Sequence, residues 1–299
     1  METKERSWGV TPVPERLRRL SGLDVGLLWG SLGISLLVLV AGTLLAPLGL
    51  PQALLAIVVG SIAGCALLGL AGLIGANRRV PGMVLLRSPL GHRGSYLPTA
   101  LNVLQNLGWA TFELIVIAAA ANALADRVFG FRERWLWVVG FGVVTVLLAL
   151  AGPIAFARRF VRRVGVWAVA ASVGYLVWWT LDGAEVGSLW SDEDTGGLSL
   201  WQGVDLTVAM AASWLPLAAD YTRFARTGRG AFWGTAIGYL VPLTLLYALG
   251  ALLLLSKGLD EPTALLTAIA GGGLASAPIV AVPPVSTTRS RWGASGKMF

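Results

Sequence analysis

The sequence is poor in cysteine, histidine and charge. Its 299 residues contain one Cys and one His, and only 13% are Asp, Glu, Lys or Arg. Cys65 alone cannot form an intramolecular disulfide, and His92 alone cannot supply the paired ligands of a zinc site. The sequence also lacks a Ser-His-Asp set, a phosphate loop and a dinucleotide fingerprint. These absences argue against the usual enzymes and against a metal or an organic cofactor.

Apolar residues dominate the chain instead. Hydrophobic residues make up 56% of it, and the mean hydropathy is +0.72. A soluble domain is about one quarter charged, so this composition is typical of a protein inside a bilayer. The 13 Trp and 38 Gly residues fit this class, because Trp anchors helices at interfaces and Gly lets helices approach closely. The composition therefore predicts an all-α integral membrane protein whose surroundings are the lipid bilayer.

Apolar runs of about 20 residues divide the chain into expected membrane spans. A cytoplasmic tail is expected at 1–23, seven helices within 24–256, a weak or partial eighth helix at 257–282 and a polar basic tail at 283–299. The seven spans are expected at 24–46, 52–75, 97–125, 135–157, 164–181, 201–223 and 231–256.

Lysine and arginine alternate between the two sides of these spans. Sixteen lie in the N-terminal tail and in the second, fourth and sixth loops, whereas the other loops hold four and the acidic loop 182–200 has none. The positive-inside rule then predicts a cytoplasmic N-terminus in a multi-pass protein of the cell membrane. Because topology accounts for the basic residues, the net charge of +7 does not indicate a nucleic-acid partner.

The third expected span has a polar face. Its members are Asn102, Asn106, Trp109 and Glu113, at positions i, i+4, i+7 and i+11, with Gly108 beside the tryptophan. A helix places these four on one side. A carboxylate near the bilayer centre costs about 2.5 to 3.5 kcal/mol on insertion scales, so it is expected to face a polar cavity or a partner. This face is therefore a candidate binding site.

Two expected helices contain residues that interrupt a helix. Glycines and serines in the first span favour an unwound turn whose backbone carbonyls could bind a cation, and the candidate residues are Trp29, Gly30, Leu32 and Gly33. In the sixth span, Pro216 follows Ser213 and Trp214 and lacks the N–H of a helical turn. Breaks at corresponding places in two five-helix halves indicate an inverted repeat with the substrate between them. The alternative is that both are ordinary kinks in packed helices.

Six segments combine Pro, Gly, aromatic and charged residues in recognisable motifs. They are Pro14-Glu15-Arg16-Leu17-Arg18, Trp29-Gly30, Pro81-Gly82-Met83, Gly91-His92-Arg93-Gly94-Ser95, Asn106-Leu107-Gly108-Trp109 and Asp220-Tyr221-Thr222-Arg223-Phe224-Ala225-Arg226. Together they resemble the nucleobase/cation symporter family, which includes cytosine permeases and hydantoin and hydroxymethylpyrimidine transporters. The resemblance covers about residues 12–275. It implies a bundle with discontinuous first and sixth helices, of which this chain is the first part of a five-plus-five inverted-repeat transporter fold.

The resemblance also implies roles for single residues. Trp109 matches the tryptophan that stacks on a flat substrate, and Glu113 matches the polar residue that bonds to the substrate's edge. An indole face is a broad apolar platform, and a carboxylate accepts two hydrogen bonds side by side, which favours amino-substituted pyrimidines. The second aromatic of the family falls at Ala211 in this chain, so Trp214 is the expected substitute. The full expected substrate set is Asn106, Gly108, Trp109, Glu113, Ser213 and Trp214.

The prediction is a secondary active transporter, a cation or proton symporter of a pyrimidine-type nucleobase such as cytosine or hydroxymethylpyrimidine. Na⁺ or H⁺ would be the coupling ion, and the sequence carries no signal for an oligomeric state. After Val282 the chain turns to Pro283, Pro284 and a basic tail, as a truncation or frameshift would produce. The alternative is thus a truncated, transport-inactive membrane protein that keeps the family architecture. An integral-membrane enzyme is disfavoured because Glu113 has no companion acid, base or metal ligand.

Overall fold

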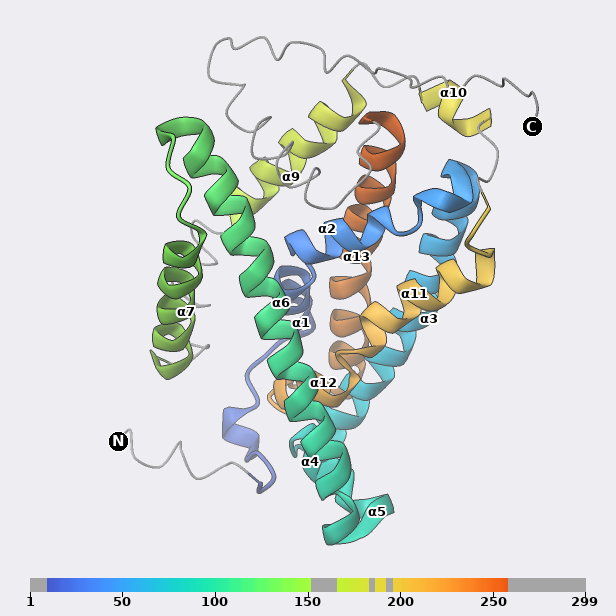
Figure 1. Ribbon diagram of the computed structural model, residues 1–299. Coiled ribbons are helices and arrows are strands. Elements are labelled where there is room, and N and C mark those ends of the chain that lie inside the picture. The colour runs from blue at the N-terminus through green and yellow to red at the C-terminus, as the bar shows by residue number, and fades with distance from the viewer. Residues whose placement is uncertain (1–9, 152–165, 183–185, 192–195, 258–299) are drawn as a thin grey trace, which may run out of the picture.

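The computed structural model describes residues 10–151, 166–182, 186–191 and 196–257, and their regular elements are all helices (Figure 1). The α-helices are α1 (Gly22–Leu32), α2 (Leu36–Thr43), α3 (Gly49–Arg78), α4 (Gly82–Leu85), α5 (Arg87–Gly94), α6 (Tyr96–Phe129), α7 (Arg134–Ala151), α9 (Val166–Leu181), α10 (Val186–Ser191), α11 (Leu200–Ala212), α12 (Leu215–Thr222) and α13 (Gly228–Lys257). Two 3-10 turns, η2 (Glu15–Leu17) and η3 (Ala46–Leu48), complete them. The expected partial eighth helix beyond Lys257 and the polar tail lie outside the described residues.

Three stretches of the described chain are long and apolar enough to cross a membrane. They are Leu37–Arg78, Tyr96–Ala123 and Gly228–Lys257. The first of these joins most of α2, the turn η3 and α3. Shorter helices occupy the other expected spans. The fourth contains α7 and the fifth contains α9, while the first is divided into α1 and α2 and the sixth into α11 and α12.

The first expected span is broken between α1 and α2. The N–H of Gly33 still donates to the carbonyl of Trp29 at 2.9 Å, so the helical turn closes before the chain leaves it. Ser35 is then extended, with φ −146° and ψ 144°, and its hydroxyl accepts the N–H of Leu37 at 3.0 Å as the N-cap of α2. An extended residue cannot continue a helix, and a serine there starts a new one. The predicted discontinuity of the first helix is confirmed.

The sixth expected span is broken between α11 and α12. The N–H of Trp214 donates to the carbonyl of Ala211, a tight i to i−3 bond of 3.2 Å, and Pro216 lies in the first turn of α12. Because proline has no N–H, the regular ladder cannot pass through this point. The N–H of Leu217 bonds to the carbonyl of Trp214 at 3.0 Å instead of to that of Ser213. The discontinuity of the sixth helix is therefore also confirmed, and it leaves the Ser213 carbonyl outside the helical ladder.

The core has a reciprocal arrangement around α3 and α13, which pack closely on each other (Figure 1). The broken pair α1 and α2 packs on α13, whereas the broken pair α11 and α12 packs on α3. Each broken helix thus lies against the long helix that follows the other break. Figure 1 shows α6 and α7 at one side of this core.

Glycines bring α1 and α13 into backbone contact. A Cβ added to Gly234 or Gly238 of α13 would collide with the carbonyl oxygen of Gly22 or Gly26 of α1, respectively. No side chain can therefore separate the two helices at these positions. Close helix approach through small residues is a common packing mode in membranes.

Short helices occupy two connections expected as loops. α4 and α5 follow α3, and α10 lies in the acidic loop. These helices have four, eight and six residues, too few to cross a bilayer. Gly91 kinks α5 with a φ of 71°, a left-handed value that glycine adopts without strain. His92 on this helix is exposed, and its Nε2 lies 3.0 Å from the Tyr96 hydroxyl.

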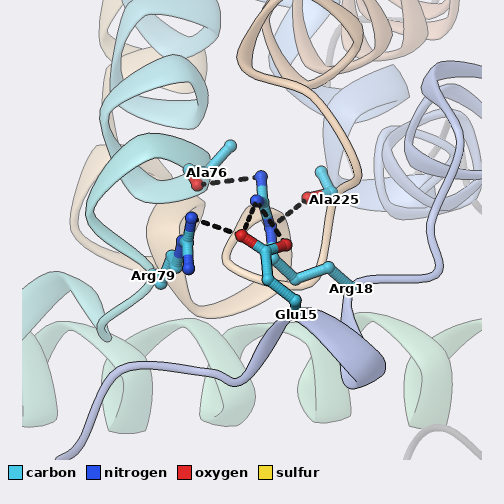
Figure 2. Close-up of polar contacts among 5 residues, drawn as sticks. All are labelled: Glu15, Arg18, Ala76, Arg79 and Ala225. Atoms are coloured by element: carbon cyan, nitrogen blue, oxygen red, sulfur yellow. Dashed lines mark hydrogen bonds and ion pairs between the residues drawn. The ribbon is translucent and has the colours of Figure 1, made fainter.

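The segment before α1 is held to the end of α3 and to the segment after α12 by the polar contacts drawn in Figure 2. Arg18 donates from Nε to the carbonyl of Ala225 at 2.9 Å and from Nη2 to the carbonyl of Ala76 at 3.4 Å. Glu15 pairs with Arg18 at 3.0 Å and with Arg79 at 2.5 Å. These five residues, called the N-terminal clamp below, join the chain start to the end of α3 and to the segment between α12 and α13.

Candidate functional site

The polar face predicted on the third span lies on one continuous helix. α6 runs through 34 residues, so the predicted helical spacing of its polar residues holds. Asn102 is buried, while Asn106, Trp109 and Glu113 are half-buried. Leucines on the other side of the helix, among them Leu104, are exposed. The polar face therefore points toward the protein.

Glu113 is joined to the break in the first helix. The hydroxyl of Ser35 donates to Oε1 of Glu113 at 2.5 Å. A hydrogen bond to an ionised carboxylate is shorter and stronger than one between neutral groups. Ser35 thereby connects α6 to the start of α2.

Gln105 is joined to the break in the sixth helix. Its Nε2 donates to the carbonyl of Ser213 at 2.6 Å. This carbonyl is available because Leu217 bonds to Trp214 instead. The tightened turn at the break in the sixth helix thus provides the acceptor that holds α6.

Trp109 lies between these two contacts. Gln105, Trp109 and Glu113 are at i, i+4 and i+8, so they share one side of α6 and follow each other at about 6 Å along its axis. A Cβ added to the neighbouring Gly108 would meet no atom within 4 Å. Trp109 thus has a hydrogen-bonded polar side chain one helical turn away in each direction.

The ring of Trp214, which is expected as a second aromatic of the site, contacts two other aromatic rings. Its ring packs edge-on against Trp29 at 5.9 Å and against Tyr239 at 6.3 Å between centroids. Trp29 is fully buried and also contacts Tyr221 at 5.7 Å. These ring contacts join α1, α12 and α13 close to the two breaks. Of the expected pair, Ser213 reaches α6 through its carbonyl, whereas the Trp214 ring belongs to this aromatic cluster.

The candidate cation-binding carbonyls lie at the end of α1. The Trp29 carbonyl already accepts the N–H of Gly33. Gly30 and Leu32 belong to the last turn of α1 and Gly33 is its C-cap, where carbonyls lose their i+4 partners. The break thus follows Leu32, three residues after the Trp29 position along the chain. In the described part of the chain, no three His, Cys, Asp or Glu side chains gather as metal ligands.

The motif at residues 220–226, the last of the six that carry the resemblance, makes contacts outside the polar face of α6. Asp220 accepts a backbone hydrogen bond from Gly82 at the start of α4. Phe224 accepts the N–H of Leu20 through its carbonyl at 3.1 Å. The motif therefore anchors α4 and the segment before α1 to the end of α12.

Sequence reasoning did not predict the two cross-contacts of α6. It placed the serines of the first span only in an unwound turn and gave Gln105 no role. A serine before an apolar run is an N-cap signal, which locates the start of α2. No local signal names Glu113 as the partner of that serine, 78 residues away.

Comparison with known proteins matches most of this chain to one family. Residues 12–260 match the family described as permease for cytosine/purines, uracil, thiamine, allantoin. A hydantoin permease of Microbacterium maritypicum is 28% identical over 173 residues, which are 56% of this chain and 34% of that permease. This chain thus spans about a third of that relative.

Two solved structures share the fold. The inward-facing conformation of Mhp1 has a TM-score of 0.71 at 19% identity, over 88% of this chain and 63% of that chain. A closed conformation of Mhp1, a nucleobase-cation-symport-1 family transporter with bromovinylhydantoin bound, has a TM-score of 0.69 at 21% identity, over 89% and 61%. The described helices therefore form the first part of an inverted-repeat transporter fold.

Proposed function

The chain belongs to the family of permeases for cytosine and purines, uracil, thiamine and allantoin, and from this premise we propose that it is a secondary active transporter of a pyrimidine-type nucleobase. Cytosine and hydroxymethylpyrimidine are the proposed substrates, carried in symport with Na⁺ or H⁺. The family is one of permeases, and its members are multi-pass membrane proteins. The identity of the substrate and that of the coupling ion are our proposal.

One observation carries the proposal. Trp109 stands between Glu113 and Gln105, and each of these is hydrogen-bonded to a helix break. A flat ring stacked on the indole would have an acceptor at one edge and the second break near the other. Stacking on a rigid aromatic gives contact area at low entropic cost, and the polar groups give orientation.

The carboxylate of Glu113 favours an amino-substituted ring. Cytosine and hydroxymethylpyrimidine present an exocyclic amine beside a ring nitrogen. When the pair shares one proton, this edge and a carboxylate form two parallel hydrogen bonds. Hydantoin is the second candidate, because one relative is a hydantoin permease and Mhp1 holds bromovinylhydantoin. Its N–H is flanked by carbonyl oxygens, so it would make one bond to Glu113 and bring an oxygen close to the other acceptor.

The carbonyl end of α1 is the proposed place for a coupling cation. The candidate carbonyls remain those of Trp29, Gly30, Leu32 and Gly33. Helix C-termini carry partial negative charge, and broken helices of transporters bind cations there. Ser35 and Glu113 lie at the same break, so a cation there would be near the proposed base edge.

Uptake measurements test the proposed function. The full chain would be reconstituted in liposomes, and uptake of radiolabelled cytosine, hydroxymethylpyrimidine, uracil and hydantoin would be measured with an inward Na⁺ gradient, with an inward proton gradient and with neither. We expect gradient-dependent uptake of the aminopyrimidines. Binding without uptake would support the alternative of a transport-inactive chain, and neither binding nor uptake would contradict the assignment of the site.

The tryptophan platform gives a first prediction at the level of a single residue. Trp109→Ala should weaken base binding by about 1 to 3 kcal/mol, the usual effect of removing an aromatic on which a base stacks, and Trp109→Phe should keep part of it. Equilibrium binding of radiolabelled cytosine measures the change. Trp201→Ala is the matched control, because Trp201 is 74% exposed. Equal losses for the two alanine variants would refute stacking on Trp109.

A further inference from the structure

We propose that Ser35 is a positioning residue of the base site, one that holds the Glu113 carboxylate in the orientation in which it meets the base. The inference rests on the proposed function, since it concerns the same site. Because Ser35 lies at the break in the first helix, this break would help to recognise the edge of the substrate.

The hydroxyl of Ser35 makes two hydrogen bonds in opposite senses. It accepts the N–H of Leu37 at 3.0 Å and donates to Oε1 of Glu113 at 2.5 Å. A serine hydroxyl has a single proton. Because its lone pair takes the helix N–H, its proton is directed at the carboxylate, and the direction of that bond is set by the backbone of α2.

This contact fixes the orientation of the Glu113 carboxyl group. Oε1 accepts the Ser35 proton with one lone pair, which leaves its second lone pair and Oε2 for the two parallel bonds to the base edge. Glu113 comes from α6 and Ser35 from the break between α1 and α2, so the plane of the carboxyl group is fixed by two separate elements. A group that is oriented before binding loses less conformational freedom when the ligand arrives.

Two other serines show that this is more than helix capping. Ser21 caps α1 and Ser199 caps α11, each in a capping box with a residue of its own first turn, Asp24 and Gln202. Ser35 also caps its helix, but without a capping box, and its proton goes to a carboxylate 78 residues away. Ser21 is therefore a matched control: the same residue type at the same kind of position without a contact to the site.

A double-mutant cycle tests the inference. Cytosine binding to the full chain in nanodiscs would be measured for wild type, Ser35→Ala, Glu113→Gln and the double variant. We expect Ser35→Ala to weaken binding about tenfold in the wild-type background, the usual effect of losing a hydrogen bond to a charged group. In the Glu113→Gln background the same substitution should change binding by less than about twofold, because the carboxylate is already absent.

Three further variants separate positioning from folding. Ser35→Thr keeps both hydrogen bonds and should retain wild-type binding. Ser35→Gly keeps most of the capping energy but has no proton to donate, so it should bind as weakly as Ser35→Ala. Ser21→Ala removes a cap at the far end of α1 and should leave binding unchanged in both backgrounds.

The outcomes distinguish this inference from the function on which it rests. A wild-type chain that binds none of the bases would overturn the proposed function and the role of Ser35 with it. Wild-type binding with equal effects of Ser35→Ala in both Glu113 backgrounds would overturn the role of Ser35 alone. Full binding by Ser35→Gly would do the same, since a cap would then be sufficient.

Discussion

At the scale of single residues, the site depends on hydrogen bonds that each serve two elements. Ser35 links α2 to Glu113, and Gln105 links α6 to the carbonyl of Ser213. The first bond uses the hydroxyl that caps α2, and the second uses a backbone carbonyl that the break in the sixth helix leaves without a helical partner. A residue change at either place is therefore expected to alter both the local backbone and the orientation of the α6 side chains around Trp109.

Glu113 gives a prediction about selectivity. Glu113→Gln keeps the shape and one acceptor but replaces the other acceptor with a donor. We expect cytosine binding to weaken at least tenfold, about 1.4 kcal/mol, and the preference to move toward uracil, whose edge accepts hydrogen bonds. Competition between cytosine and uracil measures this, with Glu133→Gln, an exposed residue in the connection before α7, as the control. An unchanged cytosine-to-uracil ratio would show that Glu113 does not read the base edge.

At the scale of elements, the two interruptions were predictable because their causes are local. Gly33 and Ser35 end one helix and start another, and Pro216 removes a donor from the sixth span. The polar face of α6 was predictable from spacing alone. The contacts of that face were not, because Gln105 and Ser213 are 108 residues apart and only tertiary packing brings them together. The contact of the Trp214 ring with Trp29 was not predictable either, because it also depends on tertiary packing.

The backbone contact between α1 and α13 gives a prediction about stability. Gly234→Ala would place a methyl group against the Gly22 carbonyl, and such overpacking costs about 1 to 3 kcal/mol. Gly140→Ala on α7 is the matched control, because a Cβ there meets nothing within 4 Å and alanine favours a helix by about 0.5 to 1 kcal/mol. We expect thermal unfolding in detergent to shift down for Gly234→Ala only. A similar shift for both variants would argue against a tight backbone contact.

At the scale of the whole molecule, the reciprocal packing relates the two halves of the fold. The pieces of each broken helix rest on the long helix of the other half, and α3 and α13 join the halves at the centre. The two breaks are thereby carried by one compact group of helices, and α6 reaches both. This arrangement places the proposed site between the halves, where an inverted repeat positions its substrate.

Orientation in the membrane is a prediction for the whole chain, and it rests on loop charge alone. With the N-terminus in the cytoplasm, a cysteine introduced by Ser191→Cys should react with an impermeant maleimide in intact cells. Arg16→Cys, in the exposed segment before α1, should react only after lysis. Cys65 is buried at 1% exposure, so it should add little background. The opposite labelling pattern would reverse the orientation.

The N-terminal clamp has a consequence for the order in which the protein is made. Arg18 leaves the ribosome early, but its partner carbonyl on Ala225 is 207 residues further along the chain. At about 5 to 20 residues per second, roughly 10 to 40 seconds of synthesis separate the two. The clamp therefore cannot close fully until both broken helices have been synthesised. The ion pair of Arg18 with Glu15, three residues away, does not have to wait for that step.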